Sequence, residues 1–370
     1  DFRPLAKPSF VRKLFGVTQD ADLSVVRVRG APRQMENQIG EAAAPQIHRM
    51  LANYREIIDA GRDRLKLDWG GAIQQARKYL QFCSGPYWEE LQGMAEGASV
   101  ALDELVVLNS FEAIVHDGLH LKCTSLALTR EWTTDGHVLM AHNEDWWPDD
   151  TETLYLVHAT PDDEPPFLAL TYGGLLPCIG FNAAGIAQCC DSVYPSDARI
   201  GVPRLFVGRS VLGARTVSEA IDRATDPDRA AGYNHLIAER EGHLISLEVS
   251  AKRFAVIGNT DGALVHTNHY LDTEMQRFEA PPDSLHRSRV RYERATELLY
   301  ADRLHSRESL GAILADHQNP PGTICCHLED AGHPLDRIAT IASVIIDLSE
   351  MTMHVARGQP CAAAFQPYML

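Results

Sequence analysis

The pattern of the chain changes at Cys123, and this change constrains the fold more than any other feature. Before Cys123, a short strand-like run at 24–30 is followed by segments with the apolar spacing of amphipathic helices, at 32–65, 71–82, 87–97 and 102–115. After Cys123 come short β-prone runs separated by turn sequences such as Thr134-Asp135-Gly136.

The β-prone runs fall into two groups with helical patterns between and after them. The first group is at 125–129, 137–142, 153–159 and 167–172, and the second at 234–240, 243–249, 254–257 and 263–266. Helical patterns return at 204–214, 216–224, 287–300 and 306–316, and the runs 338–346 and 351–356 predict a final hairpin that turns at 347–350. This arrangement predicts a layered α+β domain.

Composition and charge exclude several classes of protein. Hydrophobic residues make up 45% of the chain and charged residues 23%, which is typical of a folded globular protein. The net charge of -16 repels phosphate backbones and anionic lipid, so we expect no nucleic-acid partner. The longest apolar runs are about half the roughly 20 residues that span a bilayer, so we expect no membrane span.

The first twenty residues and the cysteines favour a reducing, cytoplasmic location. The segment 1–20 lacks the continuous apolar stretch of a secretory signal. The eight cysteines include no C-x-x-C pair, and no glycine-rich phosphate loop is present, so no metal or cofactor is expected. The pairs Cys189-Cys190 and Cys325-Cys326 lie in strand-like apolar runs, which predicts buried side chains that serve as small hydrophobes.

Cys123 begins the first strand after the helical segment. The run 137–147 is a second strand that ends in a polar cluster, and a turn at Asp135-Gly136 would bring Asn143 and Asp145 beside Cys123. One interpretation is a reactive cysteine with polar partners. The other is a buried cysteine next to a solvated acidic loop.

Five groups of residues then occur in one order along the chain. They are the helical pair 87–98 and 102–112, Cys123-Thr124-Ser125, the cluster Asn143-Glu144-Asp145-Trp146, residues 180–186, and His266-Thr267-Asn268-His269-Tyr270. In this order they resemble the acyl-coenzyme A:6-aminopenicillanic acid acyltransferase (isopenicillin N acyltransferase) family, a branch of the N-terminal nucleophile hydrolases. The resemblance extends from about residue 20 to the end of the chain.

The resemblance implies an αββα four-layer sandwich and a precursor that cleaves itself between Lys122 and Cys123. Cleavage would divide this chain into a mainly helical alpha chain, 1–122, and a nucleophile-bearing beta chain, 123–370, that remain one integrated fold. The new α-amine of Cys123 would then act as the base for its own thiol. An α-amine titrates near pH 8 and a free thiol near about 8.5, so the two can share a proton near neutrality.

The resemblance also implies roles for individual residues. Asp145 would hold the new amine, and Asn268 would donate a hydrogen bond to the oxyanion. A backbone N–H near Tyr172-Gly173 would be a second oxyanion donor, and Ser288-Arg289 would lie near the nucleophile, where the arginine favours a thiolate. Thr124 and Ser125 complete the expected substrate-binding residues.

Each of these residues also has a purely structural interpretation. Asp145 is then a turn carboxylate, Asn268 a β-bulge or cap residue, Tyr172-Gly173 a tight turn, and the repeated arginines at 287–291 a solvated helix face. In two respects the sequence departs from the pattern of the fungal members of this family, and both concern the substrate pocket. Glu144 stands where an aromatic residue is common, and the interval from Cys123 to Asp145 is several residues longer.

These observations predict a self-processing cysteine amidohydrolase or acyltransferase. It would act on a small N-acyl amide or acyl thioester through an acyl-Cys123 intermediate, and a pure hydrolase is the rival within this class. A relative that keeps the fold without processing and binds a ligand is one alternative. Another is a zinc-dependent hydrolase built on His116, His120 and Cys123 with His142 nearby, although no motif supplies a fourth ligand.

Overall fold

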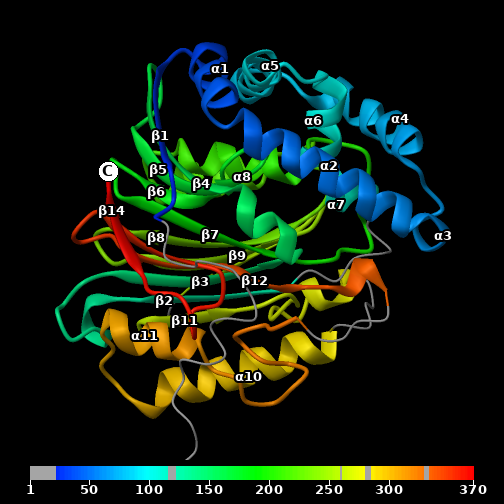
Figure 1. The fold of residues 1–370 in the computed structure, drawn as a ribbon. Helices are drawn as coiled ribbons and strands as arrows, with labels where there is room; N and C mark the ends of the chain where they lie inside the picture. The colour runs from blue at the N-terminus through cyan, green and yellow to red at the C-terminus, as the bar shows by residue number, and fades with distance from the viewer. Residues whose placement is uncertain (1–21, 116–121, 259–260, 280–284, 329–332) are drawn as a thin grey trace, which may run out of the picture.

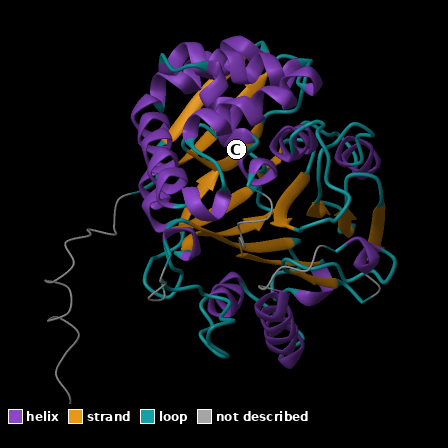
Figure 2. Ribbon diagram, turned by 90° about the vertical axis from the view of Figure 1, so that its right-hand side faces the viewer, coloured by secondary structure: helices purple, strands orange, loops and turns teal. Residues whose placement is uncertain are grey.

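The computed structural model describes residues 22–115, 122–258, 261–279, 285–328 and 333–370. Within these ranges two β-sheets lie face to face, and helices cover the outer surface of each sheet (Figure 1). Figure 2 shows the same layers after a turn of 90°. The order helix, sheet, sheet, helix confirms the predicted αββα sandwich.

The larger sheet has the strand order β1-β4-β5-β6-β7-β8-β9-β10. β1 pairs with β4 in parallel, and the other described neighbours are antiparallel. Because β1 precedes Cys123, the N-terminal segment supplies an edge strand to a sheet that the rest of the chain builds. The bounds are β1 Val25–Gly30, β4 Leu154–Pro161, β5 Phe167–Tyr172, β6 Ile179–Asn182, β7 Ile186–Ser192, β8 Tyr233–Glu239, β9 Leu244–Val249 and β10 Phe254–Gly258.

The smaller sheet has the strand order β11-β2-β3-β12-β13-β14. Its central hairpin, β2 with β3, places Lys122 opposite Asp145 and Cys123 opposite Glu144. The hairpin predicted around Asp135-Gly136 is therefore confirmed. The bounds are β2 Lys122–Leu128, β3 Leu139–Trp146, β11 Ala263–His266, β12 Ala339–Asp347, β13 Thr352–Arg357 and β14 Gln366–Met369.

One helical layer covers the larger sheet. It contains α1 Pro32–Ala42, α2 Ala44–Ala60, α3 Arg62–Leu65, α4 Trp69–Tyr79, α5 Pro86–Ala98, α6 Leu102–Asn109, α7 Phe111–Ile114, α8 Arg204–Leu212 and α9 Val217–Ala224. α1 and α5 pack backbone against backbone at two glycines. A Cβ atom on Gly93 would lie 2.1 Å from the Arg33 carbonyl oxygen, and one on Gly97 would lie 2.1 Å from that of Asn37. Only glycine permits this approach.

Two helices, α10 Leu285–Ala301 and α11 Arg307–Leu314, cover the smaller sheet. Their buried apolar side chains form a core with Leu126, Leu128 and Leu139 of the β2–β3 hairpin. The alternate residues of β2, Cys123 and Ser125, point instead toward the larger sheet. The nucleophile expected from the sequence therefore lies between the two sheets.

Two local predictions were wrong. The alternative in which the polar cluster at 143–146 forms a solvated acidic loop is wrong, because the cluster is the second half of β3 and is buried. Cys325 and Cys326 were expected in a strand, but they lie in the irregular segment between α11 and β12.

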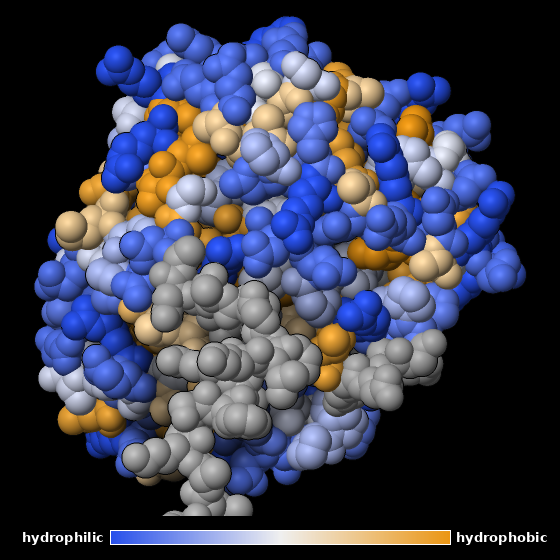
Figure 3. Space-filling model, viewed as in Figure 1, coloured by the Kyte–Doolittle hydropathy of each residue, from blue (hydrophilic) through white to orange (hydrophobic). Residues whose placement is uncertain are grey.

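On the face seen in Figure 3, hydrophilic residues predominate and hydrophobic ones are interspersed in small groups. Among the described residues, no helix combines the length and the apolar character that crossing a bilayer requires.

Candidate active site

Cys123 is buried at the wall of an apolar pocket between the sheets. Its backbone N–H donates to Oδ1 of Asn268 at 2.8 Å. The guanidinium of Arg291 donates to the same Oδ1 at 2.7 Å, to Oγ1 of Thr124 at 3.0 Å, and to the carbonyl oxygen of Cys123. Asn268 and Arg291 thus fix the backbone on both sides of the Cys123 side chain.

The arginine assigned from the resemblance needs correction. The side chain of Arg289 is 56% exposed and lies 4.0 Å from Glu279, whereas Arg291 is 1% exposed and contacts Cys123. The buried residues of α10 include Ser288, Arg291 and Ala295, which share one helical face. That spacing is the signal that distinguishes Arg291 from Arg289.

Ser288 lies in the predicted neighbourhood but contacts Asn268 rather than Cys123. Its Oγ accepts from the backbone N–H of Asn268 at 2.8 Å and lies 2.8 Å from Nδ1 of His269. Ser288 therefore helps to set the backbone from which the Asn268 side chain extends.

The amide group of Asn268 does not point its nitrogen at Cys123. Nδ2 donates to the carbonyl oxygen of Ser192 at 3.0 Å, while Oδ1 faces the Cys123 N–H. A carboxamide nitrogen has two N–H donors, so this contact leaves one of them for the predicted oxyanion bond.

Asp145 is buried on the opposite face of the β2–β3 hairpin from the thiol. Oδ1 accepts from Thr340 at 2.5 Å, and Oδ2 has no hydrogen-bond partner among the described residues. Burial raises the pKa of Asp145 to about 6, although the charges of Arg291 and Lys122 and the Thr340 bond lower it. The interpretation of Asp145 as a solvated turn carboxylate is therefore wrong, and one buried oxygen is available to a further donor.

Glu144, the residue that departs from the fungal pattern, lies beside the thiol. Its Oε2 is 3.7 Å from Sγ of Cys123 and 3.0 Å from Nε2 of His142, and its Oε1 accepts from the Tyr172 hydroxyl at 2.7 Å. The carboxylate thus connects the nucleophile to a tyrosine and a histidine. Sequence reasoning identified the residue but not this role.

The surroundings of Cys123 keep its thiol protonated in the continuous chain. Burial raises the pKa of Cys123 well above its ordinary value, and the charges of Glu144, Asp191 and Asp145 raise it further. Arg289, the arginine expected to favour a thiolate, lies near Glu279, and Arg291 donates to the Cys123 carbonyl, Thr124 and Asn268. A base must therefore take the proton before sulfur can attack.

A chain of buried polar side chains continues from Glu144 between the sheets. Ser125 Oγ lies 2.8 Å from Nδ1 of His142 and donates to Asp191 at 2.8 Å. His266 then bridges Asp191 at 3.2 Å and Glu248 at 3.1 Å. Burial lowers the pKa of His266, but its bonds to the two carboxylates outweigh burial and raise that pKa to about 9. Such connected networks order a site strongly because every member has a partner.

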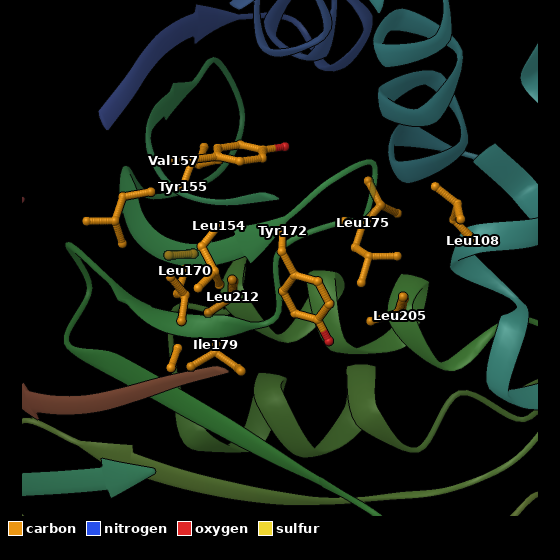
Figure 4. Close-up of a cluster of buried hydrophobic side chains, with 14 of the residues drawn as sticks. Leu108, Leu154, Tyr155, Val157, Leu170, Tyr172, Leu175, Ile179, Leu205 and Leu212 are labelled. Carbon is orange, nitrogen blue, oxygen red and sulfur yellow. The ribbon is translucent and has the colours of Figure 1, made fainter. Parts of the chain in front are cut away.

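The pocket beside Cys123 is mostly apolar. Figure 4 shows Leu108, Leu175 and Leu205 on one side of Tyr172, with Leu170 and Ile179 on the other. At a polar part of the wall, the buried Arg204 pairs with Glu112 and lies over the Tyr233 ring at 4.6 Å. The pocket suits an apolar group attached to a polar one.

Three expected substrate-binding residues have other contacts. Thr124 and Ser125 bond to Arg291 and Asp191 and do not line this pocket. The N–H of Gly173 donates to the Thr153 carbonyl oxygen at 3.0 Å, so it is not available to an oxyanion. With φ at 52° and Met50 packed where a Cβ would be, Gly173 makes a tight turn, while Tyr172 lines the pocket.

The ligands of the zinc-dependent alternative are only partly described. His116 and His120 lie outside the described residues. Cys123, His142 and Glu144 place one possible ligand atom each within 4.8 Å of one another. The glutamate oxygens already have hydrogen-bond partners, so this group has a complete explanation without a metal.

Comparison with known proteins agrees with this geometry. A model of the acyl-coenzyme A:6-aminopenicillanic acid acyl-transferase family matches residues 132–362. The 40 kDa form of the acyl-coenzyme A:6-aminopenicillanic-acid-acyltransferase of Emericella nidulans is 22% identical over 342 residues, which are 90% of this chain and 92% of that protein.

Two solved structures are also similar. One is the Caenorhabditis elegans ortholog of N-acylethanolamine-hydrolyzing acid amidase, at 18% identity and a TM-score of 0.43, covering 61% of this chain and 93% of the other. Another is a mutant conjugated bile acid hydrolase from Clostridium perfringens, at 12% identity and a TM-score of 0.46, covering 67% of this chain and 97% of the other. With a family match over more than half of its residues, the chain belongs to the acyl-coenzyme A:6-aminopenicillanic acid acyl-transferase family.

Proposed function

We propose that this acyltransferase or amide hydrolase is a self-processing enzyme whose nucleophile is Cys123. The observation that carries the proposal is the position of Cys123. Its thiol borders an apolar pocket while its backbone N–H and carbonyl are held by Asn268 and Arg291. β2 runs from Lys122 to Leu128, so the bond proposed for cleavage lies at the start of this strand.

Maturation in this proposal begins with the thiol proton. Oε2 of Glu144, 3.7 Å from Sγ, accepts it, and sulfur attacks the carbonyl carbon of Lys122. The C–S bond forms, the Lys122–Cys123 C–N bond breaks, and the released nitrogen takes up the proton as an amine. Water then hydrolyses the thioester, which leaves a carboxylate on Lys122 and restores the thiol.

The proposed partner of the new amine is the carboxylate of Asp145. Lys122 lies opposite Asp145 in the hairpin, so its departure leaves the amine of Cys123 at the strand start beside that carboxylate. The unpartnered Oδ2 of Asp145 would accept from the ammonium. The amine then serves as the base for the thiol in each turnover.

In catalysis, sulfur attacks the carbonyl of an N-acyl amide or acyl thioester. Expulsion of the amine or thiol, which takes up a proton, leaves an acyl-Cys123 thioester. Water resolves it in hydrolysis, and an amine resolves it in acyl transfer. The leucine-lined pocket favours an apolar acyl group, and the second N–H of Asn268 is the proposed oxyanion donor.

The direct test is capture of the acyl-enzyme. Matured protein is incubated with a panel of N-acyl amines and acyl thioesters of increasing chain length, quenched in acid, and digested for mass spectrometry. We expect the mass of the acyl group on the peptide that begins at Cys123. Turnover with acylation at another residue, or turnover undiminished in Cys123→Ala, would exclude Cys123 as the nucleophile.

A further inference from the structure

Four potential metal ligands converge at the surface, away from the pocket. His317, Cys325 and His327 come from the segment between α11 and β12, and Cys361 comes from the connection between β13 and β14. Each offers one ligand atom, and these four atoms all lie within 4.8 Å of one another. We propose that the cluster binds a structural zinc ion, a role that goes beyond the catalytic function.

The distances agree with a tetrahedral zinc centre. Zinc binds thiolate sulfur at about 2.3 Å and imidazole nitrogen at about 2.0–2.1 Å, so tetrahedral angles separate two sulfurs by about 3.8 Å, two nitrogens by about 3.3 Å, and sulfur from nitrogen by about 3.5 Å. The Sγ atoms of Cys325 and Cys361 are 3.7 Å apart, and the Nε2 atoms of His317 and His327 are 3.0 Å apart. Nε2 of His327 lies 3.5 Å and 3.3 Å from the two sulfurs.

Hydrogen bonding alone does not explain this arrangement. Nε2 of His327 has three close partners, His317, Cys325 and Cys361, but a ring nitrogen carries one proton or one lone pair. A disulfide between the two cysteines would also leave the convergence of two imidazoles unexplained, and both cysteines are free thiols here. One cation bound by all four atoms accounts for every contact.

Two thiolates and two imidazoles are a common ligand set for structural zinc. A closed Cys₂His₂ site has no open position for substrate, so the metal would act by cross-linking. It would tie the α11–β12 segment to the β13–β14 connection. Cys326, next to one ligand, contacts Nζ of Lys122 at 3.6 Å, so the cross-link would also hold a segment that contacts the strand carrying Cys123.

The test begins with the metal content of the untagged full chain. After purification without chelators, inductively coupled plasma mass spectrometry should find close to one zinc ion per chain. Exchange for Co²⁺ should give the intense visible absorption of a tetrahedral site with thiolate charge-transfer bands. Zinc removal by a strong chelator should lower the melting temperature, and added zinc should restore it.

Variants locate the metal. Cys361→Ser and His317→Gln, both at exposed positions, should each weaken zinc binding more than about 100-fold. Mutation of a residue that only hydrogen-bonds to a metal ligand already lowers metal affinity by about 10- to 100-fold, and loss of a ligand itself should cost more. Cys83→Ser, His243→Gln and Cys123→Ala should keep full zinc content. The last variant separates this site from the Cys123, His142, Glu144 group and from the catalytic proposal.

Three results would overturn the proposal. The first is a wild-type chain that neither carries nor takes up zinc. The second is loss of zinc in Cys123→Ala while Cys361→Ser and His317→Gln retain it. The third is a native disulfide between Cys325 and Cys361 in freshly purified protein. The Co²⁺ spectrum of the wild-type chain gives an answer even if a ligand variant fails to fold.

Discussion

The backbone N–H of Cys123 donates to the side-chain oxygen of Asn268 at 2.8 Å, although the two residues are 145 positions apart. This contact joins the start of β2 to the turn after β11. It places Asn268 next to the bond proposed for cleavage and next to the proposed nucleophile.

Two substitutions at Asn268 separate its two proposed roles. Asn268→Ala removes the acceptor for Cys123 and the oxyanion donor, so maturation should slow and turnover should fall by about 100- to 1,000-fold. Asn268→Asp keeps an acceptor for Cys123 and Arg291 but loses the N–H donor, so maturation should be less impaired than turnover. Intact mass and kcat measure the two effects. Normal turnover in a folded Asn268→Ala protein would remove Asn268 from the site.

Arg291 and Arg289 form a matched pair on one helix. Arg291→Gln loses charged hydrogen bonds to buried partners, each worth about 1.5–3 kcal/mol, and should slow maturation at least about tenfold. Arg289→Gln, at an exposed position, should change stability by less than about 0.5 kcal/mol and leave maturation unchanged. Denaturing gels of both precursors over time compare their maturation rates. Slower maturation of Arg289→Gln than of Arg291→Gln would contradict the assignment of Arg291.

Glu144→Gln should speed the alkylation of Cys123 but slow the maturation of the precursor. Removal of the Glu144 charge should lower the pKa of Cys123, so iodoacetamide should alkylate the folded precursor faster at fixed pH. Maturation should nevertheless slow about 100-fold or more, because the proton acceptor is lost. Faster alkylation together with undiminished cleavage would show that Glu144 is not the base.

His266 should make stability depend on pH. Its folded-state pKa is raised from 6.5 to about 9, so protonated His266 stabilises the fold fully below about pH 6.5, and this contribution is lost as the pH rises toward 9. The contribution is on the order of 3 kcal/mol at most. Chemical denaturation of His266→Gln should therefore differ most from the wild type at pH 6 and least at pH 9.5. The exposed His243→Gln is the control, and a difference independent of pH would exclude this role.

The sequence allowed the β2–β3 hairpin to be predicted because a turn and alternating strand residues are local signals. It could not assign Arg291 over Arg289, because the buried face of α10 is set by the sheet against which that helix packs. The burial of Glu144 likewise depends on the opposite sheet. Cys361 gave no metal signal because it is far in sequence from its three partners.

The central claim is that a free amine at Cys123 must form before the enzyme can act. The most direct measurement follows intact mass, the sequence of the new amino terminus and turnover in the same samples of wild type and Cys123→Ala. We predict that wild type gives a chain beginning at Cys123 and gains activity in proportion to it. Cys123→Ala should stay folded, uncleaved and inactive. Full turnover by an uncleaved wild-type chain would contradict the account.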